Sequence, residues 1–126
     1  MTDPALTDID ALVTEFADLV VAQNEAIQRN DPAKATHCAK QRVAVFSRLR
    51  TYGNRGRNAL ACLLADLRPG VRVMAAAYLL RHRTEDAIVV LEEEAEGDGL
   101  TAFAAAHALN RWYDGTWNYD LDQEDG

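Results

Sequence analysis

The sequence has few of the residues that mark disulfide-bonded, sheet-forming or membrane-spanning chains. Its 126 residues include two cysteines, Cys38 and Cys62, which are too few for a disulfide framework. Only 7% of the residues are aromatic and three are proline, and the apolar content is mostly Ala, Leu and Val. This composition suits packed helices better than a sheet sandwich. No apolar run is long enough to span a bilayer, and the acidic start lacks the features of a signal peptide. We therefore expect a cytoplasmic, all-α protein.

Motifs for catalysis and metal binding are also missing. The chain has no Gly-rich phosphate loop, no CxxC pair and no HExxH, and nothing around its single serine, Ser47, resembles a nucleophile elbow. His37 and Cys38 are adjacent, so on a helix they point about 100° apart and are poorly placed to bind one metal. His107, inside an Ala-rich segment, is interpreted as a core or groove histidine. We predict that the protein is not an enzyme and needs no cofactor or metal.

Charge is sorted into blocks along the chain. The net charge of −7 is made of −6 in residues 1–33, +10 in residues 34–83 and −11 in residues 84–126. Two interpretations stay open: the blocks neutralise each other when the helices pack, or one acidic block is left free to meet a basic partner. Nucleic acid is the less favoured partner, because the overall field repels phosphate.

Apolar spacing predicts a pair of helices over residues 5–51. Thr7 and Asp10 are expected to cap the first helix, which buries a stripe ending at Ile27. Asp31 and Pro32 are expected to start a second helix that runs to Leu49 or Arg50. Arg42 lies within its apolar arc, which requires its charged head to reach water. The predicted apolar positions of this helix are Ala35, Cys38, Ala39, Val43, Phe46 and Leu49. Residues 52–56, with two glycines and Asn54, are predicted to form a turn.

A weak repeat of thirty residues covers positions 57–112. Each unit is predicted to form a short helix, a tight turn at 66–70 or 97–99, and an Ala-rich helix. Runs of three alanines at 75–77 and 104–106 allow close helix packing. The sequence therefore predicts a stack of helical hairpins in which each hairpin buries its face against the next, about six helices in one domain over residues 1–126.

Residues 113–126 form a tail rich in aromatic and acidic side chains. Gly115 is expected to end the last helix, and residues 122–126 are expected to fray. One interpretation is that the aromatic residues, Trp112 above all, seal the open end of the last hairpin. The other is that Trp117 and Tyr119, which lie beyond the glycine and are harder to bury, anchor a basic protein surface.

Two resemblances rest on these residues. The stretch from Leu63 through Asp66 and Pro69-Gly70-Val71-Arg72 resembles a HEAT repeat, which implies an ion pair between Asp66 and Arg72. The chain over roughly residues 10–117, opening with Leu12-Val13-x-x-Phe16, also resembles a small bacterial family of helical-repeat proteins of unknown function. Some members of that family look like immunity proteins of polymorphic toxin systems, which bind and silence a toxin.

The resemblance and the missing catalytic motifs lead us to predict a non-enzymatic protein-binding module. We expect an immunity or antitoxin-like protein that blocks a bacterial effector toxin through its basic surface. An adaptor or self-associating protein is the alternative, so a homodimer stays open. An enzyme or nucleic-acid handler, supported by the basic middle block alone, is the third, and no membrane partner is expected. The predicted binding residues are carboxylates and tail aromatics: Glu92, Glu93, Glu96, Asp98, Trp112, Tyr113, Asp114, Trp117, Tyr119 and Asp120.

Overall fold

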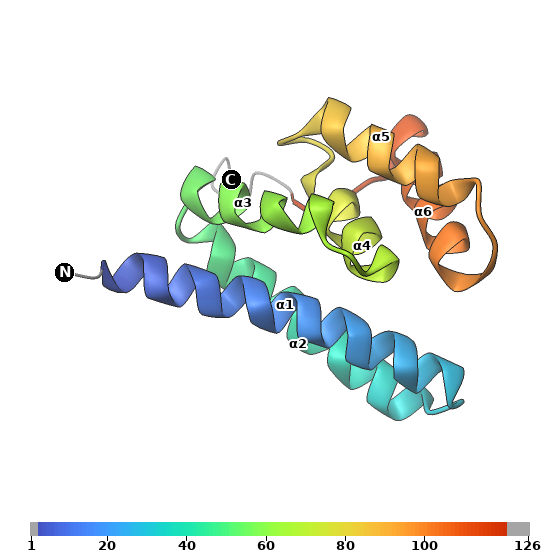
Figure 1. The fold of residues 1–126 in the computed structure, drawn as a ribbon, viewed down its shortest axis with the longest axis horizontal. Helices are drawn as coiled ribbons and strands as arrows, with labels where there is room; N and C mark the ends of the chain where they lie inside the picture. Colours follow the sequence, from blue (N-terminus) through green and yellow to red (C-terminus); the bar gives the residue numbers. More distant parts are fainter. Residues whose placement is uncertain (1–2, 121–126) are drawn as a thin grey trace. The chain divides into compact units, whose positions relative to one another are not determined.

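The computed structural model describes residues 3–120, and that part of the chain is helical without a strand (Figure 1). The predicted all-α fold is confirmed, whereas the segment expected to fray, 122–126, lies outside the described residues. None of the described helices combines the length and the apolar character needed to cross a membrane. The elements are α1 (Pro4–Gln28), α2 (Pro32–Arg50), α3 (Asn54–Leu60), the 3-10 helix η1 (Ala61–Ala65), α4 (Pro69–Leu79), α5 (Thr84–Ala95) and α6 (Gly99–Tyr113).

The chain divides into two units between Leu63 and Leu64. The sequence placed the change from helical pair to repeat between residues 51 and 57. The division falls later because α3 packs on α1 and α2. The short helix that was predicted to open the first HEAT-like hairpin therefore belongs to the N-terminal unit.

An Asp-Pro pair, with Asp as the N-cap and Pro as the first helical residue, sets the starts of α1 and α2. Asp3 caps α1 by accepting a hydrogen bond from the Ala5 amide at 2.9 Å, and Pro4 is the first helical residue. The predicted start at Thr7 is wrong, because the Asp3-Pro4 pair supplies an earlier cap of the same type. Asp31 caps α2 as predicted, with its carboxylate 3.1 Å from the Lys34 amide.

The buried face of α2 is rotated from the predicted one. Arg42 is buried and donates a hydrogen bond to Gln23 of α1, whereas the neighbouring Val43 is 52% exposed. The expected position of Arg42 within the apolar arc is confirmed, whereas the expectations that its head reaches water and that Val43 is buried were wrong. Adjacent helical positions point about 100° apart, so turning Arg42 toward its acceptor on α1 carries Val43 toward solvent. The buried positions of α2 are Ala35, Cys38, Arg42, Val45, Phe46 and Leu49.

Glycines place α3 against the end of α2. Gly53 takes a φ of +62° immediately before α3, and the predicted turn is therefore shorter than expected. Gly56 lies inside α3 rather than in the turn and is buried. A Cβ on Gly56 would overlap the Leu49 carbonyl oxygen and lie 2.9 Å from the carbonyl carbon. The α3 backbone therefore approaches α2 at a distance that only glycine allows.

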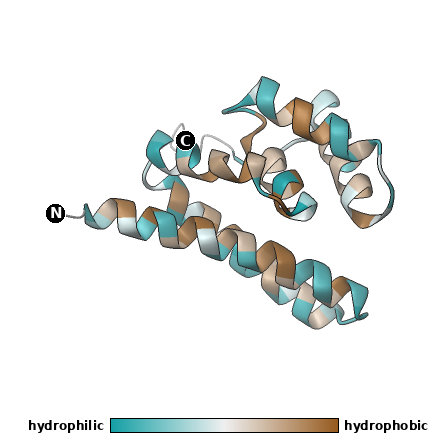
Figure 2. Ribbon diagram, viewed as in Figure 1, coloured by the Kyte–Doolittle hydropathy of each residue, from teal (hydrophilic) through white to brown (hydrophobic). Residues whose placement is uncertain are grey.

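The C-terminal unit packs α4, α5 and α6 around small side chains. Its core joins Val73 and the alanines of α4 to Ala87 and Leu91 of α5 and to Ala105 of α6. The tight turn predicted at 97–99 lies where α5 has ended at Ala95 and α6 begins at Gly99. Figure 2 shows both hydrophobic and hydrophilic stretches along α5, as one buried and one solvated face require.

The turn before α4 differs from the one that the HEAT resemblance implied. The Asp66 carboxylate accepts hydrogen bonds from the amide and from Nε of Arg68, both at 2.9 Å. Arg72 donates to the Asp66 carbonyl oxygen at 2.7 Å and pairs with Glu94 of α5 at 2.6 Å. The implied Asp66–Arg72 ion pair is replaced because Arg68, two residues from Asp66, occupies its carboxylate.

This turn predicts a loss of stability in acid. The hydrogen bonds from Arg68 lower the pKa of Asp66 from 3.8 to about 2. A carboxyl whose pKa is lower in the folded state stabilises that state above its ordinary pKa and loses this effect as the pH falls from about 4 to about 2. In Asp66→Asn we expect that dependence to flatten, at a cost on the order of 1 kcal/mol at neutral pH. Urea unfolding at several pH values measures the pH dependence of stability and the cost at neutral pH. An equal pH dependence of the free energy of unfolding in the two proteins would contradict the assignment of the acid loss to Asp66.

Candidate protein-binding surface

The negative charge of the chain resides in its C-terminal unit. Residues 1–63 contain eight basic and seven acidic residues, whereas residues 64–126 contain five and thirteen. Acids and bases of the N-terminal unit pair directly, as Arg48 does with Asp8 at 3.3 Å and Arg55 with Asp3 at 3.0 Å. Pairing between the sequence blocks occurs in both units, since Arg72 pairs with Glu94 in the C-terminal one, but the excess of acids remains in the C-terminal unit.

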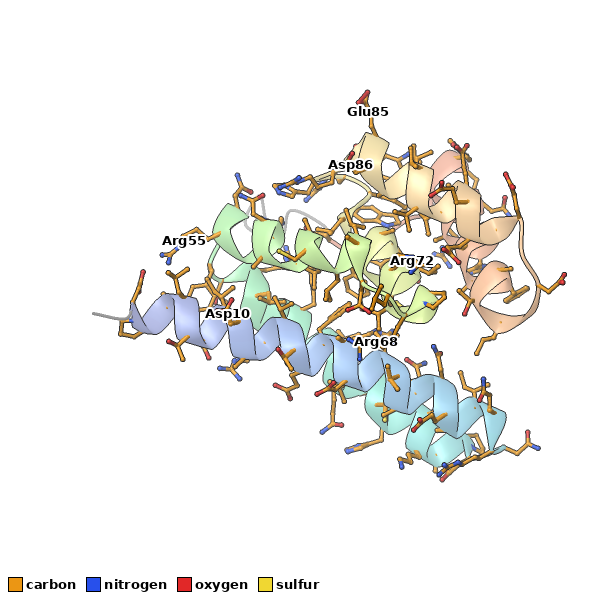
Figure 3. The ribbon with its side chains drawn as sticks, viewed as in Figure 1. Asp10, Arg55, Arg68, Arg72, Glu85 and Asp86 are labelled. Carbon is orange, nitrogen blue, oxygen red and sulfur yellow. The ribbon has the colours of Figure 1, made fainter. Side chains whose placement is uncertain are left out.

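Within the C-terminal unit, most of the exposed carboxylates of the described residues lie on α5 and its C-cap. Glu92, Glu93 and Glu96 are exposed, and Glu85 projects from the start of the helix (Figure 3). In the part of the chain that the structure describes, Glu92, Glu93 and Glu96 form no ion pair, whereas Glu94 is held by Arg72. The interpretation that the charge blocks neutralise each other therefore holds for Glu94. The other three remain available to a cation from outside.

These carboxylates also lie at an unfavourable end of their helix. The last turn of α5 contains no basic residue, and the C-terminus of a helix carries a partial negative charge. Glu92 and Glu93 approach that end, and Glu96 caps it. The repulsion is relieved when a basic group binds there, so this surface favours a cationic partner.

A tight turn reverses the chain after α6. Gly115 takes a φ of +82°, and the Thr116 amide reaches back to the Arg111 carbonyl at 2.9 Å, as in a Schellman motif. The predicted helix end at Gly115 is confirmed. Asp114 accepts hydrogen bonds from the Thr116 hydroxyl at 2.5 Å and amide at 3.0 Å, which lower the pKa of its carboxyl. Asp114 is therefore an exposed carboxylate at the end of α6.

The tail aromatics close the C-terminal unit. Trp117 is only 9% exposed, and its Nε1 donates to the Ala77 carbonyl at 2.6 Å. Tyr119 stacks on Tyr78 with ring centroids 4.7 Å apart, and Trp112 meets Trp117 edge to face at 5.3 Å. The expectation that Trp117 and Tyr119 resist burial was wrong, because the turn at 115 returns the chain to the end of α4. Ala77 is in the last turn of α4, where carbonyls lack helical donors.

Two of the predicted binding residues are therefore inaccessible. Asp120 is 1% exposed and lies 4.0 Å from Arg81, and Trp117 is 9% exposed. Trp112 and Tyr119 are partly buried against the core. The predicted binding residues that reach the surface are Glu92, Glu93, Glu96, Asp98, Tyr113 and Asp114.

The sequence interpretation missed an apolar stripe on α6. Leu100 and Phe103 are exposed, and the Phe103 ring stacks on His107 at a centroid distance of 6.3 Å. His107 is exposed, which excludes the core alternative of its interpretation as a core or groove histidine. These three residues recur at intervals of three and four, opposite the buried Ala102 and Ala105. That spacing was visible in the sequence and was obscured by the alanine run between them.

The N-terminal unit offers a hollow of a different kind. A shallow pocket of about 410 Å³ lies between α1 and α2, lined by Gln23, Ala35, Thr36, Ala39, Lys40 and Val43. Its only charged lining group is one lysine. Among the described residues, no group of three His, Cys, Asp or Glu side chains is placed to hold a metal ion.

Comparison of the chain with protein-family models, with curated proteins and with solved structures finds no match. The resemblance to immunity proteins therefore stays a prediction.

Proposed function

We propose that this chain is a non-enzymatic protein-binding module whose C-terminal unit binds a partner with a basic surface. The observation that carries the proposal is the set of exposed acids on α5, Glu92, Glu93 and Glu96, which have no cation within the described part of the chain. Complementary charge of this kind raises association rates and selects among partners.

The same charge argues against two other classes of partner. Nucleic acid and the anionic face of a membrane both present phosphate, which thirteen acids against five bases in residues 64–126 repel. Exposed aromatic and apolar side chains on α6, in contrast, are typical of protein interfaces. A basic protein surface fits both features.

The more specific role that we propose is that of an immunity or antitoxin-like protein. In this role the carboxylates of α5 occupy the basic cleft of a bacterial effector toxin and occlude it. The resemblance of residues 10–117 to a family with such members supports this role. Co-expression with the product of each neighbouring gene tests it. We expect one neighbour to be toxic alone and harmless together with this chain, and the immunity role fails if no neighbour behaves so.

The acids of α5 predict a salt-dependent association rate. Replacing Glu92, Glu93 and Glu96 together by glutamine should slow association with the cognate partner about tenfold at low salt, and less as screening increases. The matched control replaces three exposed acids of α1, Glu15, Asp18 and Glu25, by glutamine. Surface plasmon resonance at several salt concentrations gives both rates. Equal slowing in the two triple variants would contradict a binding role for α5.

An adaptor or self-associating protein is the alternative. It is favoured by the pocket between α1 and α2, beside which Ile27 and Val43 are exposed. Light scattering coupled to size exclusion separates the cases, because a stable homodimer that covers the acids of α5 would leave no free surface for a toxin.

A further inference from the structure

The outward face of α6 exposes more apolar surface than its fold requires. Phe103 is 70% exposed, and Leu100, one turn before it, is exposed as well. The helix is fixed by its opposite face, where Ala102, Ala105 and Ala108 are buried. We call Leu100, Phe103 and His107 the α6 stripe.

Two of the three side chains of the α6 stripe contact each other. The rings of Phe103 and His107 are nearly parallel, at 13°, with centroids 6.3 Å apart. The stripe follows the helix axis for about 10 Å, given a rise of 1.5 Å per residue over seven residues. Exposed Leu and Phe side chains along a helix match the apolar face of a second helix, which presents side chains at the same spacing.

Carboxylates lie beyond both ends of the stripe. Glu96 and Asp98 precede the first turn of α6, and Asp114 follows its last turn. All three are exposed, and the Asp114 carboxylate accepts hydrogen bonds from Thr116. Asp98 and Asp114 are sixteen residues apart in the sequence, or about 24 Å along a helix axis.

We propose that the α6 stripe anchors a basic amphipathic helix of the partner protein. Its apolar side chains cover Leu100 and Phe103, and Lys or Arg residues near its two ends pair with Asp98 and Asp114. The helix is therefore about four to five turns long, with cationic ends and an apolar middle. This inference rests on the proposed function, since it names the segment of the partner that the acidic unit recognises.

The same geometry disfavours a second copy of this chain. Two α6 helices packed antiparallel along their stripes would bring Asp98 of each copy near Asp114 of the other. Like charges in that position repel, and the C-terminal unit is already strongly acidic. A partner with basic ends meets no such opposition.

A designed peptide supplies the probe. The peptide has eighteen residues, with leucines on one helical face of its middle and lysines at both ends. One control peptide replaces the leucines by glutamine, and another replaces the lysines by glutamate. Calorimetry with the full chain should show binding of the first peptide and at least tenfold weaker binding of both controls.

Variants of the chain locate the contact. Phe103→Ser should weaken binding of the leucine-lysine peptide at least tenfold. The matched control is Leu67→Ser, since Leu67 is 94% exposed and lies in the same unit but outside α6. Its affinity should stay within about twofold of the original. Circular dichroism of each variant verifies that the helices are intact.

Three results would overturn the inference: equal binding of the glutamine peptide, unchanged affinity in Phe103→Ser, or a homodimer in light scattering that Phe103→Ser abolishes. Failure here is distinguishable from failure of the proposed function. If the Phe103→Ser chain still rescues cells from the toxin, the inference about the α6 stripe fails and the immunity role stands. If peptide binding depends on Phe103 but the chain neutralises no neighbouring gene product, the inference about the α6 stripe stands and the immunity role fails.

Discussion

Gly56→Ala should destabilise the N-terminal unit by at least about 3 kcal/mol, the upper end of the range for overpacked cores. The added Cβ would overlap the Leu49 carbonyl oxygen and lie 2.9 Å from its carbon, and both are backbone atoms that no rotamer change can move. In an exposed helix the same substitution stabilises by about 1 kcal/mol through helix propensity. The close approach between α3 and α2 therefore reverses the sign of the expected stability change. Urea unfolding followed by far-UV circular dichroism measures the change.

A second glycine provides the control for this experiment. A Cβ on Gly97 would lie 3.5 Å from the Glu94 carbonyl oxygen, which is ordinary van der Waals contact. Gly97→Ala should therefore change stability by less than about 0.5 kcal/mol. If both variants unfold at the same urea concentration as the original, α3 does not approach α2 as closely as the structure shows.

Local signals in the sequence were sufficient for most helix boundaries and insufficient for what each helix buries. Asp31-Pro32 and Gly115 marked helix ends because caps and left-handed turns are properties of one or two residues. The buried face of α2 could not be obtained in this way. Whether Arg42 or Val43 turns inward depends on Gln23, an acceptor on another helix, and an apolar pattern cannot express such a partner.

The candidate surface, too, could be predicted from the sequence only in part. The exposed acids of α5 were predictable, since a run of like charges at a helix end finds few partners within a small protein. The burial of the tail was not, because its partner, the Ala77 carbonyl, lies forty residues earlier in the chain. The α6 stripe is the opposite case, since its spacing was in the sequence and only burial revealed that Phe103 faces solvent.

Trp117→Ala should cost the C-terminal unit about 3–5 kcal/mol, as expected for a buried aromatic residue. The substitution removes the ring that contacts Trp112 at 5.3 Å and Tyr119 at 6.3 Å, and it leaves the Ala77 carbonyl without its indole donor. Trp117→Phe keeps most of the packing and loses the donor, so its cost should be about 1–3 kcal/mol. Urea unfolding by far-UV circular dichroism orders the variants without depending on tryptophan fluorescence.

The exposed Tyr113 supplies the control, because Tyr113→Ala should change stability by less than about 0.5 kcal/mol. The pair of variants also decides between the two interpretations of the tail. A sealing indole makes Trp117→Phe less stable with unchanged partner affinity in the folded protein, because the side chain is buried before any partner arrives. An anchoring indole gives the reverse, unchanged stability and weaker binding. If the Trp117→Ala protein is as stable as the Tyr113→Ala protein, the sealing interpretation is contradicted and Trp117 is again a candidate binding residue.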